Sequence, residues 1–111
     1  MKTVEKMAAQ GDVLFQRIDE IPKGAKVEKA SGKIVVAHSE TGHHHAIERR
    51  LGVVHFRSAD PLVSYLDVPK HADVVHLRVF DTHETLRLTK GKWAVRRQRE
   101  MTPEGWRRVE D

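Results

Sequence analysis

Hydrophobic and polar residues alternate with a period of two over short segments along most of the chain. This pattern is typical of β-strands with one buried face, and the segments are rich in β-branched and aromatic residues. Among segments of ten residues, only residues 1–10 allow a helical period, so they could form a short helix or an extended arm. The apolar spacing of residues 62–68 would also suit a short helix. We predict strands at residues 12–18, 33–38, 43–47, 52–57, 62–68, 73–80, 85–89 and 92–98.

Turn signals separate these segments. Ile21–Gly24 contains proline and glycine, and Ser31–Gly32, Pro69–Ala72 and Lys90–Gly91 have similar composition. Strands that recur about every ten residues between such turns indicate an antiparallel architecture. We therefore predict an all-β fold, a small antiparallel barrel or sandwich of about seven to eight strands. Residues 1–10 would be an N-terminal arm, and residues 11–111 a single β domain.

The composition narrows the function classes. The chain has 111 residues and no cysteine, which excludes disulfides, thiolate nucleophiles and cysteine-based zinc sites. No apolar run approaches the roughly 20 residues needed to cross a bilayer, and residues 1–10 lack the apolar stretch of a secretory signal. No nucleotide-binding glycine loop, nucleophile elbow or HExxH motif occurs. We expect a soluble cytoplasmic protein with no membrane association.

Three consecutive histidines, at positions 43–45, are the most informative chemical feature of the chain. On a strand, His43, His45 and Ile47 share one face, and the burial expected of Ile47 would turn both histidines inward. Buried imidazoles need a metal ion or hydrogen-bond partners. His83 is the best third ligand, and His83 and Glu84 are candidate acid–base residues. We predict a site for a divalent transition metal (zinc, iron, manganese or nickel) at His43, His45 and His83, with a structural hydrogen-bond network as the alternative.

The remaining histidines have different predicted roles. His55 and His76 are expected to face solvent, because their apolar neighbours in sequence lie on the opposite strand face. His71 falls in a predicted turn and is expected to be exposed. His38 shares a face with apolar residues, so it is either a core histidine or a fourth member of the site.

The HxH pair after a glycine, on a strand of a small β-rich chain, resembles the first metal motif of the cupin barrels. That family holds iron, manganese, zinc or nickel through two histidines, a glutamate and a histidine from a later strand. The resemblance implies that His43 and His45 are the pair and that Glu48 is the carboxylate. His76 or His83 would then be the late histidine.

The segment Thr41–Ile47, of the form TGHxHAI, is also similar to small bacterial and phage proteins that have no assigned activity. This resemblance implies a family but no mechanism, and no small-molecule substrate follows from the sequence. A regulatory protein that binds another protein, with structural histidines, is therefore one functional hypothesis. Self-association into a homo-oligomer is a further expectation, since small β domains often associate.

Basic residues are concentrated near the C-terminal end. The chain carries a net charge of +4, whereas residues 87–108 contain eight basic and two acidic residues. Arginines contact phosphates and aromatic rings can stack on bases, so an alternative function is binding of RNA or single-stranded DNA. The candidate nucleic-acid residues are Trp93, Arg96, Arg97, Arg99, Trp106, Arg107 and Arg108.

Overall fold

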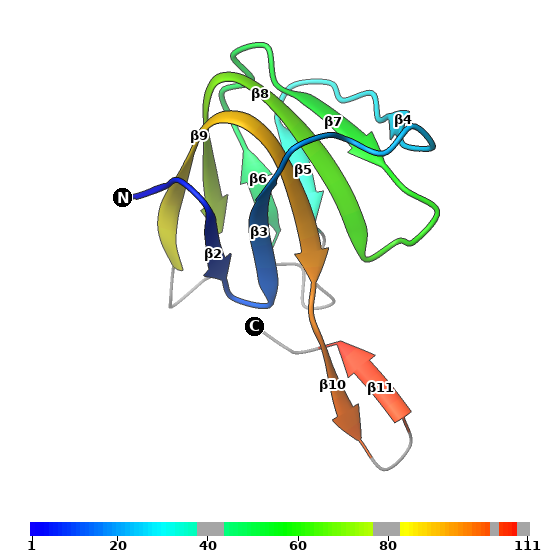
Figure 1. Cartoon of the computed structure of the whole chain (residues 1–111). Helices are drawn as coiled ribbons and strands as arrows, with labels where there is room; N and C mark the ends of the chain where they lie inside the picture. The colour runs from blue at the N-terminus through cyan, green and yellow to red at the C-terminus, as the bar shows by residue number, and fades with distance from the viewer. Residues whose placement is uncertain (38–43, 77–82, 103–104, 109–111) are drawn as a thin grey trace.

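The computed structural model describes the backbone of residues 1–37, 44–76, 83–102 and 105–108, and the side chains of residues 1–37, 44–76 and 84–98. All the secondary-structure elements in this part of the chain are strands, which confirms the all-β prediction (Figure 1). The strands are β1 (Lys2–Val4), β2 (Met7–Gln10), β3 (Val13–Ile18), β4 (Lys26–Val27), β5 (Ile34–Ala37), β6 (His45–Ile47), β7 (Val54–Arg57), β8 (Val63–His76), β9 (His83–Arg97), β10 (Arg99–Thr102) and β11 (Gly105–Arg108).

Nine of the described strands form one sheet. Its main order is β2-β3-β9-β8-β6-β5, and β7 pairs with both β8 and β4. All pairings are antiparallel except that of β1, which runs parallel to β9. The described strands make an open, curved sheet, because β2 and β5 end the main order without pairing to each other. Strands β10 and β11 form a separate hairpin that extends from the end of β9 (Figure 1).

The long hairpin of β8 and β9 is the frame of the fold, and both strands arch over the top of the molecule in Figure 1. The predicted turns at Pro69–Ala72 and Lys90–Gly91 are wrong, because both segments lie inside these strands. The pairing register shifts between Val68 and His71, so the two strands bend there without separating. One limb of the arch pairs with β3 and β7, and the other pairs with β1 and β6.

The first ten residues belong to the sheet and form neither a helix nor a free arm. Strand β1 pairs with β9, and β2 pairs with β3. Val4, Ala8 and Gln10 are buried, whereas Met7 and Ala9 are exposed, so the period of two continues through this segment. An alternating segment of this kind gains its burial only beside a partner strand.

The core lies inside the curve of the sheet. On β8, Leu66, Val68, Ala72 and Val74 are buried and the odd-numbered residues beside them are half-buried, whereas Pro69 and Lys70 at the bend are exposed. Several large side chains have less than 2% of their surface exposed: Trp93, Phe15, Ile34, Ile47, Leu66 and Leu88. No helix that could cross a bilayer occurs in the described residues.

Gly91 allows β9 to bend. Its φ of +148° lies in a region that residues with a side chain rarely adopt. A Cβ at this position would overlap the guanidinium of Arg17, which donates to the carbonyl of Lys90 at 2.7 Å and to the Thr89 hydroxyl. We expect Gly91→Ala to lower the free energy of unfolding by about 1–3 kcal/mol in urea denaturation. Gly24→Ala is the matched control, because its added Cβ would have no neighbour within 4 Å; an equal loss in both variants would contradict the prediction.

Asp73 and Arg87 are cross-strand partners on β8 and β9 and form a two-pronged ion pair of 2.7 and 2.9 Å. The hydrogen bonds from Arg87 lower the pKa of Asp73 below its ordinary value of 3.8, against the opposing effect of partial burial. The pair therefore stabilises the fold above that pH, and the contribution is lost as pH falls through the lowered pKa. We expect Asp73→Asn to reduce the melting temperature on the order of 1–3 °C at pH 7. The difference from wild type should vanish by about pH 2, and a constant difference across this range would refute the assignment.

Candidate histidine site

Two histidines stack inside the curve of the sheet. His45 on β6 and His76 on β8 are register partners, and both side chains are fully buried. Their ring centroids are 3.8 Å apart, and the rings are inclined by 19°. His76 is in turn the register partner of His83 on β9. Three histidines therefore occupy paired positions on three adjacent strands, and we call this set the histidine row.

Gln10 fixes the hydrogen bonding of His45. The His45 Nδ1 atom lies 2.9 Å from the Gln10 side-chain oxygen. The Gln10 amide nitrogen donates to the carbonyls of Val74 and Glu84, both at 2.9 Å. Because both amide protons are used in this way, the Gln10 oxygen is the acceptor and His45 Nδ1 carries the proton. Gln10 thus joins β2 to β6, β8 and β9.

Asp12 connects the same ring to a buried arginine. Its Oδ1 atom lies 3.5 Å from His45 Nε2, and its Oδ2 atom accepts a hydrogen bond of 3.2 Å from Arg97 Nη2. The Asp12 carbonyl accepts the amide of Gln98, which ties the β2–β3 connection to the end of β9. The side chains of Asp12 and Arg97 are 2% and 8% exposed. A charged pair in such an environment has little contact with water, so it depends on its hydrogen bonds to other protein groups.

Of the three predicted metal ligands, the structure describes the side chain of one, His45. His45 is buried, as its position beside Ile47 predicts. His43 lies outside the described residues, and of His83 only the backbone is described. Among the described residues, no group of three or more histidine, aspartate or glutamate side chains could hold a metal ion. The metal site remains a prediction.

Glu84, the second predicted acid–base residue, is exposed. Its carboxylate lies 3.8 Å from the N-terminal amine, while its backbone carbonyl accepts the bond from Gln10. The carboxylate is therefore on the surface, and its main-chain oxygen is part of the Gln10 network. Its catalytic role stays a prediction.

The prediction that His76 faces solvent is wrong. The sequence is apolar on both faces here, and the structure buries Val74 and His76 instead of the odd-numbered residues around them. His55 and His71 are half-buried rather than exposed, and His38 lies outside the described residues. Sequence reasoning also missed Gln10 and Asp12, because a Gly-Asp pair after a short segment is an ordinary turn signal.

The candidate nucleic-acid residues fall into three groups. Trp93 is fully buried, so a base could not stack on it unless the core opened. Arg97 is mostly buried and bonded to Asp12, whereas Arg96 is exposed on the same strand. The remaining side chains lie outside those described: Arg99, Trp106, Arg107 and Arg108.

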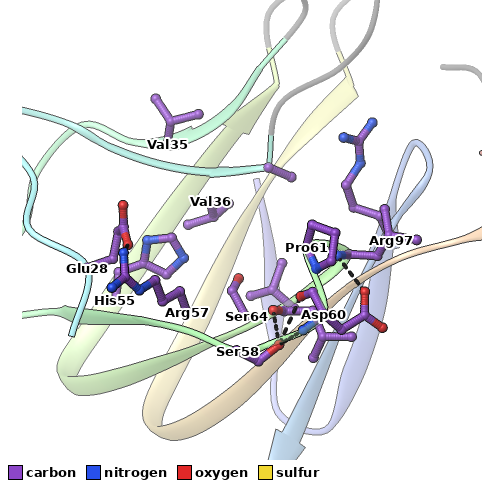
Figure 2. Close-up of a pocket in the computed structure, with 14 residues that line it drawn as sticks. Glu28, Val35, Val36, His55, Arg57, Ser58, Asp60, Pro61, Ser64 and Arg97 are labelled. Atoms are coloured by element: carbon purple, nitrogen blue, oxygen red, sulfur yellow. Dashed lines mark hydrogen bonds and ion pairs between the residues drawn. The ribbon is translucent and has the colours of Figure 1, made fainter. Parts of the chain in front are cut away.

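A cleft of about 490 Å³ opens beside this network, between β5 and β7 and against the start of β8 and the end of β9. Figure 2 shows His55 and Arg57 at one end of it and Arg97 at the other. The Ser58 hydroxyl, at the rim, accepts the amide of Asp60 at 3.1 Å and donates to the carbonyl of Val63 at 2.8 Å. Several buried apolar residues line the cleft: Val36, Ala37, Leu62 and Val95.

Comparison with known proteins adds a family but no activity. No curated protein and no solved structure matches the chain. Nothing in the comparisons supports the cupin resemblance, and Glu48, its proposed carboxylate, is exposed. A family model described as a domain of unknown function (DUF8820) matches residues 9–98, which include the histidine row, Gln10, Asp12 and Arg97 but not the β10–β11 hairpin. The chain therefore belongs to the DUF8820 family.

Proposed function

We propose that this protein binds one divalent transition-metal ion at the histidine row. The observation that carries the proposal is the strand register, which pairs His45 with His76 and His76 with His83. Directly opposed residues on antiparallel strands have Cβ atoms about 4.5–5.5 Å apart, within the reach of two imidazoles that share an ion. The sequence predicts His45 and His83 as ligands together with His43, and the register adds His76 between His45 and His83.

The surroundings of the row support a metal ligand set. Metal-binding histidines usually bond through their second nitrogen to a carboxylate or an amide oxygen, which fixes the ring. Asp12 and Gln10 approach the two nitrogens of His45 at 3.5 and 2.9 Å. Metal binding requires the His45 ring to release one of these partners. The stacked rings must also turn, because their in-plane lone pairs run side by side.

Zinc is the ion that we expect, since imidazole nitrogens bind it at about 2.0–2.1 Å and three of them leave a fourth position for water. Such an ion could act as a Lewis acid or activate that water. Iron, nickel and manganese are the other candidates, and the absence of cysteine from the chain makes a thiolate site impossible.

Metal analysis of untagged protein tests the proposal. We expect about one zinc ion per chain after dialysis against a weak chelator, and a rise in melting temperature with zinc. His45→Ala and His76→Ala should reduce bound zinc to a small fraction, and Asp12→Asn should weaken affinity by about 10–100-fold. His71→Ala is the matched control, because His71 is a half-buried histidine earlier on β8, separated from His76 by a second register shift between Val74 and His76.

Cobalt substitution keeps the test informative if an alanine variant fails to fold. In wild-type protein, bound Co²⁺ should give the intense visible absorption of a tetrahedral site, and His76→Gln should abolish it. Sub-stoichiometric metal that is equal in wild type and all variants would refute the proposal. A loss of stability in His45→Ala that is the same with and without chelator would assign the histidines a structural role.

A further inference from the structure

The cleft between β5 and β7 is lined by an arginine with a buried donor that has no acceptor among the described residues. Arg97 lines the cleft, and its side chain is only 8% exposed. Its Nη2 atom bonds to Asp12, but no described residue offers a hydrogen-bond acceptor to its Nε atom. A buried donor left in this way costs about 1–3 kcal/mol. A ligand oxygen would recover that free energy if a shift of the Arg97 side chain brought the Nε atom to the wall of the cleft.

The opposite end of the cleft carries both a basic and an acidic side chain. His55 and Arg57 project from β7 toward Glu28 (Figure 2). Glu28 lies 3.5 Å from the Arg57 guanidinium, so this carboxylate already has a partner. Asp60 is exposed, and its Oδ1 atom accepts the amide of Leu62 at 2.9 Å. The buried Asp12 carboxylate already offsets the charge of Arg97, so a ligand anion would share the guanidinium with Asp12 and would be held by directional hydrogen bonds rather than by net positive charge.

The floor of the cleft is apolar and continuous with the core. Val36, Leu62 and Val95 are all less than 9% exposed. The volume of about 490 Å³ lies within the range of small-molecule sites, which combine apolar walls with a few polar groups. A ligand complementary to this cleft therefore combines an apolar body, which packs on the walls, with an anionic oxygen, which accepts a hydrogen bond from Arg97.

We infer that this cleft binds a small organic carboxylate, whose carboxylate accepts from Arg97 and whose apolar body lies against Val36, Leu62 and Val95. The inference goes beyond the metal proposal and does not depend on it. A cleft that bound ligands only through its apolar walls would take up neutral and anionic compounds with similar affinity. A site built around a buried guanidinium should distinguish them, because only the anion forms a charge-assisted hydrogen bond.

Methyl NMR of the metal-free, full-length protein tests the inference, with octanoate and phenylacetate as probes and octanamide and phenylacetamide as neutral analogues. We expect saturable shifts of the Val36, Leu62 and Val95 methyl groups. The carboxylates should bind at least about tenfold more tightly than the amides, which corresponds to about 1.4 kcal/mol. Equal affinity for the acids and amides, or shifts that do not saturate, would overturn the inference.

Two variants locate the site. Ser64→Trp places a large ring in the cleft and should abolish octanoate binding. Thr85→Trp is the matched control, because Thr85 is a half-buried hydroxyl residue on β9 that does not line the cleft, and binding should be retained. Octanoate binding that survives in Ser64→Trp would overturn the assignment. If Ser64→Trp does not fold, the comparison of acids with amides in wild-type protein still decides the question.

Discussion

Asp12→Ala is expected to lower the free energy of unfolding by about 3–5 kcal/mol. Asp12 is the carboxylate partner of Arg97 and also faces His45 Nε2 at 3.5 Å. Its removal would leave the Arg97 guanidinium, which is 8% exposed, without this buried counter-charge. An uncompensated buried charge is far more destabilising than the loss of a surface ion pair.

Urea denaturation followed by circular dichroism measures this loss. Asp19→Ala is a suitable control, because Asp19 is an exposed aspartate directly after β3, and its removal should change stability by less than about 0.5 kcal/mol. The double variant Asp12→Leu/Arg97→Met removes both charges and should be more stable than Asp12→Ala alone. A loss below about 1 kcal/mol in Asp12→Ala would show that Arg97 is not held by this carboxylate.

The short-range features of the fold could be predicted from the sequence. Alternation over two residues located β3, β5, β7 and the separate limbs of β8 and β9, because a strand with one buried face must alternate. The alternation could not show that Pro69–Ala72 and Lys90–Gly91 are bends inside continuous strands. A proline or glycine has the same local signature in a turn and in a bend, and only the pairing of β8 with β9 decides between them.

The inward orientation of one histidine could also be predicted from alternation, but that of a second histidine could not. His45 could be placed inward because Ile47, two residues later, needs burial. His76 could not, because Val74 and Val75 present apolar side chains on both faces, and the face that is buried depends on the register with β6. Gln10 lies 35 residues from its partner His45, and no pattern local to either residue announces such a contact.

Arg97 connects the histidine site to the cleft. It bonds to Asp12, which faces His45, and it also lines the cleft between β5 and β7. Sequence reasoning assigned Arg97 to a basic nucleic-acid surface because it lies in a run of arginines. The structure instead makes it a mostly buried residue that two candidate sites share. A ligand carboxylate that bonds Arg97 should therefore also change the environment of Asp12.

Trp93→Ala is expected to destabilise the protein by about 3–5 kcal/mol. The ring is fully buried, and its N–H donates to the carbonyl of Thr89 at 2.9 Å. The Arg17 guanidinium lies 4.7 Å from the ring centroid, and Arg17 also bonds to the bend of β9 at Lys90. Loss of the indole would thus leave a cavity beside the arch and remove the surface on which Arg17 packs.

Guanidinium chloride unfolding measures the effect, with Arg96→Ala as the control, since Arg96 is an exposed residue on the same strand. Trp93→Phe retains most of the apolar volume and should lose less than the alanine variant. The same variants separate the core role from the nucleic-acid hypothesis. A base-stacking tryptophan would lose RNA affinity in Trp93→Phe with little change in stability, whereas a core tryptophan loses stability first. A fully buried ring with a main-chain hydrogen bond can only behave in the second way, so normal stability in Trp93→Ala would contradict its place in the core.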